Sequence, residues 1–430
     1  MPVALAMLDG WNLDFSPMLL LAATVVMAAV LAAVGYYLSR RKTIGLIRNG
    51  QETRATPDYY GLHTLVLMFL PSLLISIVVF IAKVAGVAEV PNLISIATWV
   101  VLPALILLPA LLLVRANLNA RILVERVIYL LLLSAALLSI VTTLGILLSV
   151  LFESIRFFEQ VSFVEFVTGT TWSPGGAFLE GAGRGGEQGA DSQFGAVPLF
   201  AGTAMITAIA MLVAVPLGLL AAIYTAEYAP RRARRMIKPM LEILAGIPTV
   251  VYGFFAAITL APMIVKAASW LGLHASYENA LAPGVIMGVM IIPFMSSLCD
   301  DIISSLPQNI RLASMALGST RSEMIKKVVL PAALPGIMSA FLLSVSRAIG
   351  ETMIVVMAAG MAANLTANPL DQMATVTVHI VANLTGDLAY DNPQTLSAFG
   401  LGLTLLILTL VLNIISAVVI RKFRQRYEGD

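Results

Sequence analysis

The sequence contains little charge, little histidine and a single cysteine. Only 12% of its 430 residues are charged, about half of the ~25% that is usual in soluble domains. The 26 Lys and Arg nearly balance the 24 Asp and Glu, and a net charge of +2 does not indicate a nucleic-acid partner. Because Cys299 is the only cysteine, an internal disulfide is excluded and a thiolate metal cluster is not expected. His63, His274 and His379 show no ligand spacing, so we expect no metal and no cofactor.

The sequence also lacks a phosphate-binding loop of the form G-x-x-x-x-G-K-[ST]. We therefore expect no ATP site and no catalytic residues in this chain. Residues 1–16 contain no Lys or Arg, whereas a secretory signal peptide begins with a positively charged region. We expect the first apolar run to be a retained membrane helix.

Hydrophobic residues make up 59% of the chain, and many apolar runs reach the ~20 residues that a helix needs to cross a bilayer. The ~10-residue alternating segments of a transmembrane barrel are not seen. The sequence therefore predicts an all-α, polytopic membrane helical bundle with nine spans. These are 17–38, 62–82, 93–114, 124–151, 196–223, 241–268, 282–299, 334–359 and 397–420.

Basic residues alternate between the predicted connections. Twenty-one of the 26 fall in or at the edge of every second connection and the tail, four fall in or at the edge of the others, and Arg347 lies deep inside a span. Because Lys and Arg favour the cytoplasmic side, the N-terminus is predicted outside and the C-terminus in the cytoplasm. Residues 1–120, with three spans, are interpreted as an appended membrane unit, and residues 121–430 as a six-helix core.

Two outer connections differ in composition. Residues 168–195 are rich in glycine, which is typical of a loop. Residues 361–395 contain no Lys or Arg, and their VTVHIVANLTG portion predicts a short re-entrant or interfacial helix.

The cytoplasmic connection at 300–333 contains clear helix boundaries. Pro307 suits the first turn of a helix over about Gln308–Leu317. Gly318 fits the position after that helix, where a positive φ is favourable for glycine. Thr320 and Glu323 form a capping box for a second helix.

Pro331 and Pro335 are expected to end that second helix before the next span. The prediction is two short helices at an angle on the cytoplasmic side. A DNA-binding helix-turn-helix is an alternative, but such a module needs a soluble domain around it. A simple ordered loop is the other alternative.

A resemblance to a known family begins in this connection. The string Ala313-Ser314-x-x-x-Gly318, nine residues, then Val328-x-Leu330-Pro331 resembles the EAA loop of ABC importer permeases, which couples the permease to its ATPase. The family's Glu falls on Leu312 here. The resemblance implies that the coupling loop includes the following positions: Leu312, Ala313, Ser314, Gly318, Leu330 and Pro331.

Two further strings, 227–256 and 345–360, resemble the phosphate-specific PstC and PstA permeases, and 164–174 is more similar to PstC. The resemblance covers about residues 121–430. It implies a permease for inorganic phosphate in the bacterial inner membrane. The implied partners are a second, PstA-like permease, a PstB-like ATPase dimer and a PstS-like periplasmic phosphate-binding protein.

Three alternatives stay open at this point: a PstA-type partner permease, a permease for another oxyanion, and an ion-gradient-driven secondary anion transporter. Secondary transporters usually contain paired repeats and broken helices, and neither is evident in this sequence. A membrane sensor is a further alternative, although no signalling domain follows the tail.

Arg347 and Glu351 lie inside the predicted span 334–359. An intramembrane charge is costly and marks a functional site by default. At a spacing of four they would share a helix face with Ser344. An arginine suits multi-donor binding of phosphate oxygens, and the resemblance implies that Arg347 and Glu351 line the substrate pathway. The alternative is an ion pair that only fixes helix packing.

Glu242 is a further candidate at the start of the predicted span 241–268. It follows the basic run Arg231–Lys238, which we interpret as a topology determinant contacting anionic lipid headgroups. Pairing of Glu242 with those cations is the simpler interpretation.

Overall fold

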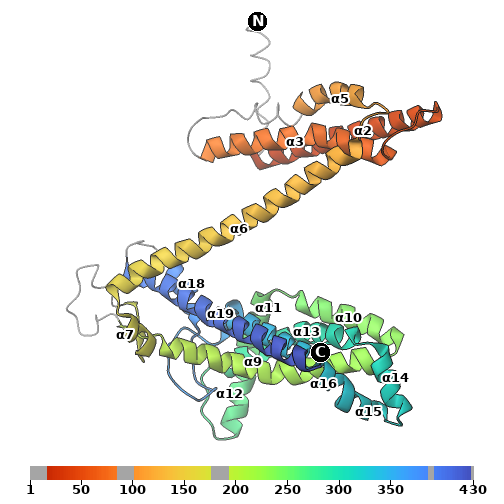
Figure 1. Cartoon of the computed structure of the whole chain (residues 1–430). Helices are drawn as coiled ribbons and strands as arrows, with labels where there is room; N and C mark the ends of the chain where they lie inside the picture. Colours follow the sequence, from red (N-terminus) through yellow and green to blue (C-terminus); the bar gives the residue numbers. More distant parts are fainter. Residues whose placement is uncertain (1–16, 85–100, 176–192, 386–391, 428–430) are drawn as a thin grey trace. The chain divides into compact units, whose positions relative to one another are not determined.

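A computed structural model describes residues 17–84, 101–175, 193–385 and 392–427. The chain divides into two compact units, Met1–Thr143 and Leu144–Asp430 (Figure 1). Most of the predicted glycine-rich connection 168–195 and the first part of the predicted span 93–114 lie outside the described residues.

The first unit contains α2 (Pro17–Arg48), α3 (Pro57–Val84), α5 (Leu102–Leu113) and the first part of α6 (Ala120–Gln160). α2, α3 and α5 pack against one another. Tyr60 of α3 is fully buried, and its hydroxyl lies within 3.1 Å of the Ala116 and Leu118 carbonyl oxygens. Burial of this ring therefore ties the start of α3 to the connection between α5 and α6.

The second unit begins with the rest of α6 and is also helical. Its further elements are α7 (Phe163–Thr168), β1 (Trp172–Ser173), β2 (Gln193–Phe194), α9 (Val197–Ile223), η2 (Tyr224–Tyr228), α10 (Arg231–Ala245), α11 (Thr249–Phe255), η3 (Ala256–Leu260), α12 (Ala261–Trp270), α13 (Leu281–Ser305), α14 (Gln308–Ala316), α15 (Arg321–Met324), η4 (Ile325–Val329), α16 (Leu330–Ile349), α17 (Met353–Ala358), α18 (Val376–Leu384) and α19 (Pro393–Tyr427). β1 and β2 form one antiparallel pair.

The centre of this unit is the pair α9 and α13, which pack along much of their length. Small residues make the close approach possible. A side chain at Gly288 would place its Cβ 2.8 Å from the Ala210 carbonyl oxygen, and one at Gly218 would lie 2.9 Å from the Met295 side chain. Such small-residue contacts are typical of helices packed inside a membrane, and they make α9 and α13 a tightly joined pair.

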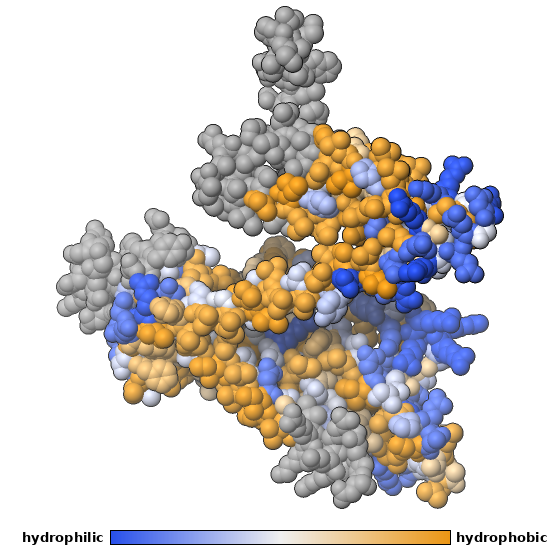
Figure 2. Space-filling model, turned by 45° about the horizontal axis from the view of Figure 1, so that its top comes forward, coloured by the Kyte–Doolittle hydropathy of each residue, from blue (hydrophilic) through white to orange (hydrophobic). Residues whose placement is uncertain are grey.

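Seven helices among the described residues are long and apolar enough to cross a membrane. They overlap the second and the fourth to ninth predicted spans. Figure 2 shows hydrophobic surface along the helices of each unit and hydrophilic surface gathered toward their ends. The predicted short helix in 361–395 is confirmed as α18. Within the second unit, α14 and α15 lie at the same end as α10, and α18 lies at the other end (Figure 1).

Two predicted spans need correction. The predicted span 241–268 is not one helix, because α10 ends at Ala245 and the membrane helix runs over Thr249–Trp270. Pro248 stands at the break as the N-cap of α11, where a residue without an N–H costs no helical hydrogen bond. The predicted span 334–359 also breaks, because α16 ends at Ile349 and α17 begins at Met353.

Candidate functional site

The predicted coupling loop at 300–333 has the expected helix–glycine–helix geometry. α14 runs over Gln308–Ala316 with Pro307 as its N-cap. Gly318 adopts φ +85°, in the left-handed region. Thr320 and Glu323 form the expected capping box at the start of α15, with both reciprocal hydrogen bonds present. Local turn chemistry therefore sets the angle between α14 and the following helix.

The prediction that Pro331 and Pro335 end the second helix is wrong. α15 continues through the π-helical turn η4 into α16, and the whole segment Arg321–Ile349 is one membrane-length helix. Pro331 occupies the first turn of α16, directly after the wider π turn. Such a turn relieves the clash between a proline ring and the preceding carbonyl groups.

The six predicted coupling residues fall into two groups. Leu312, Ala313 and Ser314 lie on α14, which has no buried residue, and Leu312 is 58% exposed. The Ser314 hydroxyl lies 2.7 Å from the Ser319 hydroxyl across the turn at Gly318. Leu330 and Pro331 instead form the start of α16. The loop thus presents α14 outward while its C-terminal part belongs to the membrane helix.

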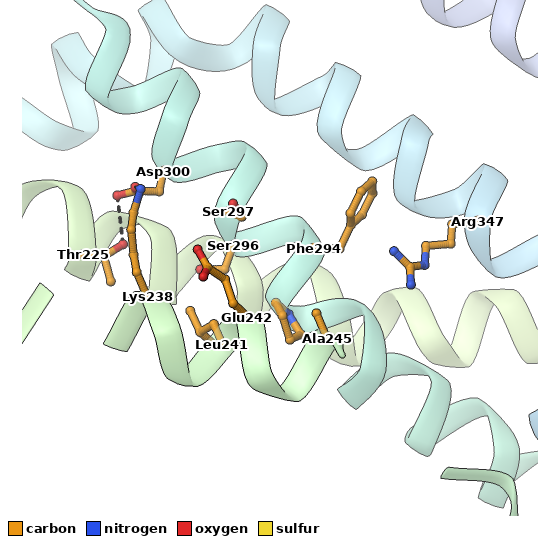
Figure 3. Close-up of a pocket in the computed structure, with 11 residues that line it drawn as sticks. Thr225, Lys238, Leu241, Glu242, Ala245, Phe294, Ser296, Ser297, Asp300 and Arg347 are labelled. Carbon is orange, nitrogen blue, oxygen red and sulfur yellow. Dashed lines mark hydrogen bonds and ion pairs between the residues drawn. The ribbon is translucent and has the colours of Figure 1, made fainter. Parts of the chain in front are cut away.

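A cavity of about 220 Å³, with a mainly apolar lining and a few polar side chains, lies where α10 meets α13, near the end of α16 (Figure 3). It is lined by Thr225, Lys238, Leu241, Glu242, Ala245, Pro293, Phe294, Ser296, Ser297, Asp300 and Arg347. Two of the sequence candidates, Arg347 and Glu242, therefore share one cavity although they are more than 100 positions apart. At ~30 Å³ per water molecule, the cavity has room for a small oxyanion.

Asp300 organises one wall of this cavity. Its side chain is 2% exposed and accepts hydrogen bonds from Thr225 at 3.0 Å and Arg234 at 3.0 Å. Lys238 lies 2.6 Å from the same carboxylate. The hydrogen bond with Asp300 raises the pKa of Lys238 above its ordinary value and outweighs the opposing effect of desolvation. Two cations of α10 thus share one carboxylate of α13, and these contacts hold the two helices together.

Arg347 occupies the last turn of α16, with its guanidinium carbon 5.1 Å from the Phe294 ring centroid. In Figure 3, Phe294 stands between Arg347 and the Glu242 side chain. In the part of the chain that the structure describes, no ion pair involves Arg347 or Glu242. Arg234 and Lys238 of the basic run of α10 pair with Asp300 and Asp301 and not with Glu242. Both side chains are exposed and hold unused donors or acceptors.

Ser296 adds a buried polar group to the cavity. It is 1% exposed, and within the described residues its hydroxyl has no hydrogen-bond partner. A buried hydroxyl without a partner costs free energy unless water or a ligand satisfies it. The cavity therefore contains a cationic donor, a carboxylate acceptor and an unsatisfied hydroxyl, which together can hold a small polar anion.

The predicted polar stripe of Ser344, Arg347 and Glu351 is not present, because the helix ends before Glu351. The Glu351 carboxylate accepts from the Met353 and Ile354 backbone N–H groups at 3.2 and 3.4 Å and so caps α17. Ser344 is fully buried, donates to the Ala340 carbonyl oxygen at 2.8 Å and lies 3.6 Å from the Met295 sulfur. Neither residue lines the cavity that contains Arg347.

Sequence reasoning missed Asp300, Lys238 and Ser296 as parts of the cavity. The sequence signal for Asp300 was an acidic pair, Asp300–Asp301, at the end of an apolar run. This pair has the opposite charge to the basic stretch of α10. Ser296 has no comparable signal, because a serine inside a membrane helix more often bonds to its own backbone.

Comparison with known proteins identifies the family. Residues 214–428 match the family model described as "Binding-protein-dependent transport system inner membrane component". A probable ABC transporter permease protein, YqgH, from Bacillus subtilis is 37% identical over 194 residues, which are 45% of this chain and 61% of that protein. The phosphate transport system permease protein PstC from Mesorhizobium japonicum is 30% identical over 230 residues, covering 49% of this chain and 69% of that protein.

Among solved structures, a bacterial alginate ABC transporter in complex with an alginate-bound periplasmic protein aligns with a TM-score of 0.49. The identity is 14%, and the alignment covers 70% of this chain and 96% of that chain. The family match spans half of the present chain and includes the cavity and the coupling loop. The chain therefore belongs to the inner membrane permease components of binding-protein-dependent ABC transport systems.

Proposed function

We propose that this chain is the permease subunit of an importer for inorganic phosphate and that the cavity around Arg347 is part of the translocation path. The carrying observation is Arg347 itself, an exposed charge on a membrane helix that lines this cavity. Because a charge facing lipid costs several kcal/mol, this face is expected to meet water or a second subunit. The relative from Mesorhizobium japonicum, named as a phosphate transport permease, supports phosphate as the substrate.

The chemistry of the cavity suits phosphate. The Arg347 guanidinium offers several donors in one plane, which matches the spacing of two phosphate oxygens. Glu242 and the unpartnered Ser296 hydroxyl line the same cavity. A carboxylate near the path keeps binding weak, which a translocation step requires for release.

Glu351 and Ser344 have lesser parts in this proposal. Glu351 stands at the break between α16 and α17, where its charge would lie along the path beyond Arg347. Ser344 supports the path indirectly, since it packs α16 against Met295 of α13.

The assembly that we propose contains a second, PstA-like permease and a cytoplasmic PstB-like ATPase dimer. A PstS-like periplasmic protein would deliver phosphate. α14 would contact the ATPase through its exposed face, with Leu312 in place of the family's Glu. In this assembly the N-terminus is outside, the C-terminus is cytoplasmic, and residues 1–120 form a membrane unit added to the core at 121–430.

Uptake of labelled phosphate at micromolar concentration tests the proposal in cells that lack this chain but keep the other subunits. The wild-type chain is expected to restore ATP-dependent uptake. Hydrogen bonds to a charged group contribute about 1.5–3 kcal/mol, and about 1.4 kcal/mol corresponds to tenfold. R347Q should therefore reduce uptake about tenfold or more at equal membrane levels, and R347K should be intermediate.

R232Q is the matched control, because Arg232 is an exposed arginine of α10 that does not line the cavity. It should transport like the wild type. Equal uptake by the wild type and R347Q would make Arg347 a structural residue. Absence of phosphate uptake by the wild type, with uptake of another oxyanion, would show that phosphate is the wrong substrate.

A further inference from the structure

Arg311 of α14 uses all three guanidinium nitrogens in contacts with the membrane helices. Nε lies 2.9 Å from Glu227 Oε1, Nη1 donates to the Leu306 carbonyl oxygen at 2.7 Å, and Nη2 donates to that of Ile303 at 2.6 Å. The Arg311 and Glu227 side chains are only 15% and 7% exposed. By contrast, Lys327 and Glu323 of the same loop are 76% and 48% exposed and lie 3.7 Å apart.

The acceptors of Arg311 belong to the ends of two other helices. Ile303 lies in the last turn of α13 and Leu306 is its C-cap, at the end of the helix where carbonyl groups attract a cation. Glu227 lies in η2, the π-helical continuation of α9. One guanidinium thus connects α14 to the ends of both α9 and α13.

The other contacts of α14 run to α15 and η4. Among the described residues, Arg311 is the only α14 side chain that hydrogen-bonds to α13 or η2. The covalent link from α13 to α14 consists of Leu306 and Pro307. Without Arg311, α14 would lose its side-chain hydrogen bonds to the ends of α13 and η2 and would remain joined to α13 by this short link.

We propose that Arg311 and Glu227 form the joint through which a displacement of α14 by the ATPase reaches the packed pair α9 and α13. The inference rests on the proposed coupling function of α14. Arg311 is a positioning residue, since it acts through the helices that it connects and not on the substrate. Lysine cannot replace it fully, because one ammonium lacks the planar fork that serves three acceptors in fixed directions.

The first test measures whether α14 and α9 move as one body. Spin labels at N309C on α14 and L212C on α9 report the distance within one chain of the assembled transporter, before and after trapping with ATP and vanadate. Both positions are exposed, and the native Cys299 is fully buried and expected not to label. On trapping, the distribution of distances between the two labels should stay constant when Arg311 and Glu227 are both present. It should shift or broaden in R311Q and E227Q.

K327Q is the matched control, because it removes a cation from the same loop without touching the joint. It should behave like the wild type. A wild-type distance that changes on trapping as much as that of R311Q would overturn the proposal, and so would a constant distance in all variants. This readout needs no transported substrate, so its result is independent of whether phosphate is the right ion.

The second test counts phosphate transported per ATP hydrolysed in proteoliposomes that contain the complete transporter and the loaded binding protein. R311Q should lower this ratio at least fivefold while the ATPase co-purifies in wild-type proportion. R311K should be intermediate. If transport and ATP hydrolysis fall together at an unchanged ratio, the pair only stabilises the fold and the joint is refuted.

Discussion

The ammonium of Lys238 lies 2.6 Å from a carboxylate oxygen of Asp300, and this contact joins a helix outside the membrane spans to the end of a buried one. Arg234, one turn earlier in α10, bonds to the same carboxylate. α10 has no buried residue of its own. These polar contacts and the packing of Leu244 against the core therefore hold α10 against α13 and set the shape of the cavity.

Removal of the Asp300 charge should loosen α10. D300N leaves Arg234 and Lys238 without their shared anion, but both cations are 36% exposed and regain water. We therefore expect a loss of about 1–3 kcal/mol, below the ~3–5 kcal/mol of a fully buried pair. A lower midpoint of thermal unfolding in detergent checks this expectation. D301N is the control, since Asp301 is 68% exposed, and it should change the midpoint little.

The sequence correctly predicted the structural elements that are determined by residues close together in the chain. The angle between α14 and α15 follows from Gly318 and the Thr320–Glu323 capping box, and each of these acts over at most three neighbouring positions. The membrane helices follow from long apolar runs. Such features need no knowledge of the tertiary structure, so one sequence is sufficient to predict them.

Helix breaks inside apolar segments were missed for a different reason. Gly246 and Pro248 separate α10 from α11, and Gly350 separates α16 from α17. A hydropathy window averages over these positions, because the residues on both sides are apolar. The breaker signals were present in the sequence, and the opposite error arose at Pro331, where a π turn accommodates the ring.

The contacts that build the cavity depend on tertiary packing. Arg347 lines the same cavity as Glu242 only because α10 and α16 both pack against α13. Arg311 and Glu227 are 84 positions apart. No periodicity within one segment indicates such pairs. Arg347 and Glu242 were therefore candidates without known neighbours, and Arg311 and Glu227 were not candidates at all.

Substitution of Gly318 should show the effect of backbone strain separately from that of side-chain packing. No heavy atom lies within 4 Å of the position that a Cβ would occupy there, while φ is +85°. G318V should therefore insert normally but distort the turn, because a left-handed residue costs about 1–2 kcal/mol and a β-branched side chain resists it most. Uptake of labelled phosphate should fall strongly in G318V.

G318N is the informative control, since asparagine tolerates the left-handed conformation. It should keep most of the uptake. Normal transport by G318V at wild-type membrane levels would show that the turn geometry is not needed for coupling.

The two roles of Glu351 can be separated with two substitutions. E351Q keeps an oxygen that accepts from the Met353 and Ile354 N–H groups but removes the charge, whereas E351A removes both. Loss of a capping side chain costs about 1 kcal/mol, so thermal stability should fall in E351A and stay near wild type in E351Q. If the charge lines the path, uptake should fall in both variants; wild-type uptake by E351Q would limit Glu351 to capping.

The buried imidazole of His379 predicts a pH-dependent stability. Trp172 Nε1–H donates to His379 Nδ1 at 3.1 Å, and Nε2 lies 3.1 Å from the Met361 carbonyl oxygen. The ring is therefore neutral with its proton on Nε2. Desolvation lowers the pKa of His379 to about 4. Protonation of Nδ1 would place two N–H groups against each other at the Trp172 contact.

Because the unfolded chain binds this proton at a pKa of about 6.5, the contribution of neutral His379 is fully present above pH 6.5. It is lost progressively as the pH falls toward 4, by about 3 kcal/mol in total. H379Q keeps a donor and an acceptor without a titratable group. Its thermal midpoint should fall less than that of the wild type between pH 7 and pH 4.5, and H274Q, at an exposed histidine, should follow the wild type. Parallel curves for H379Q and the wild type would show that His379 does not set the acid sensitivity.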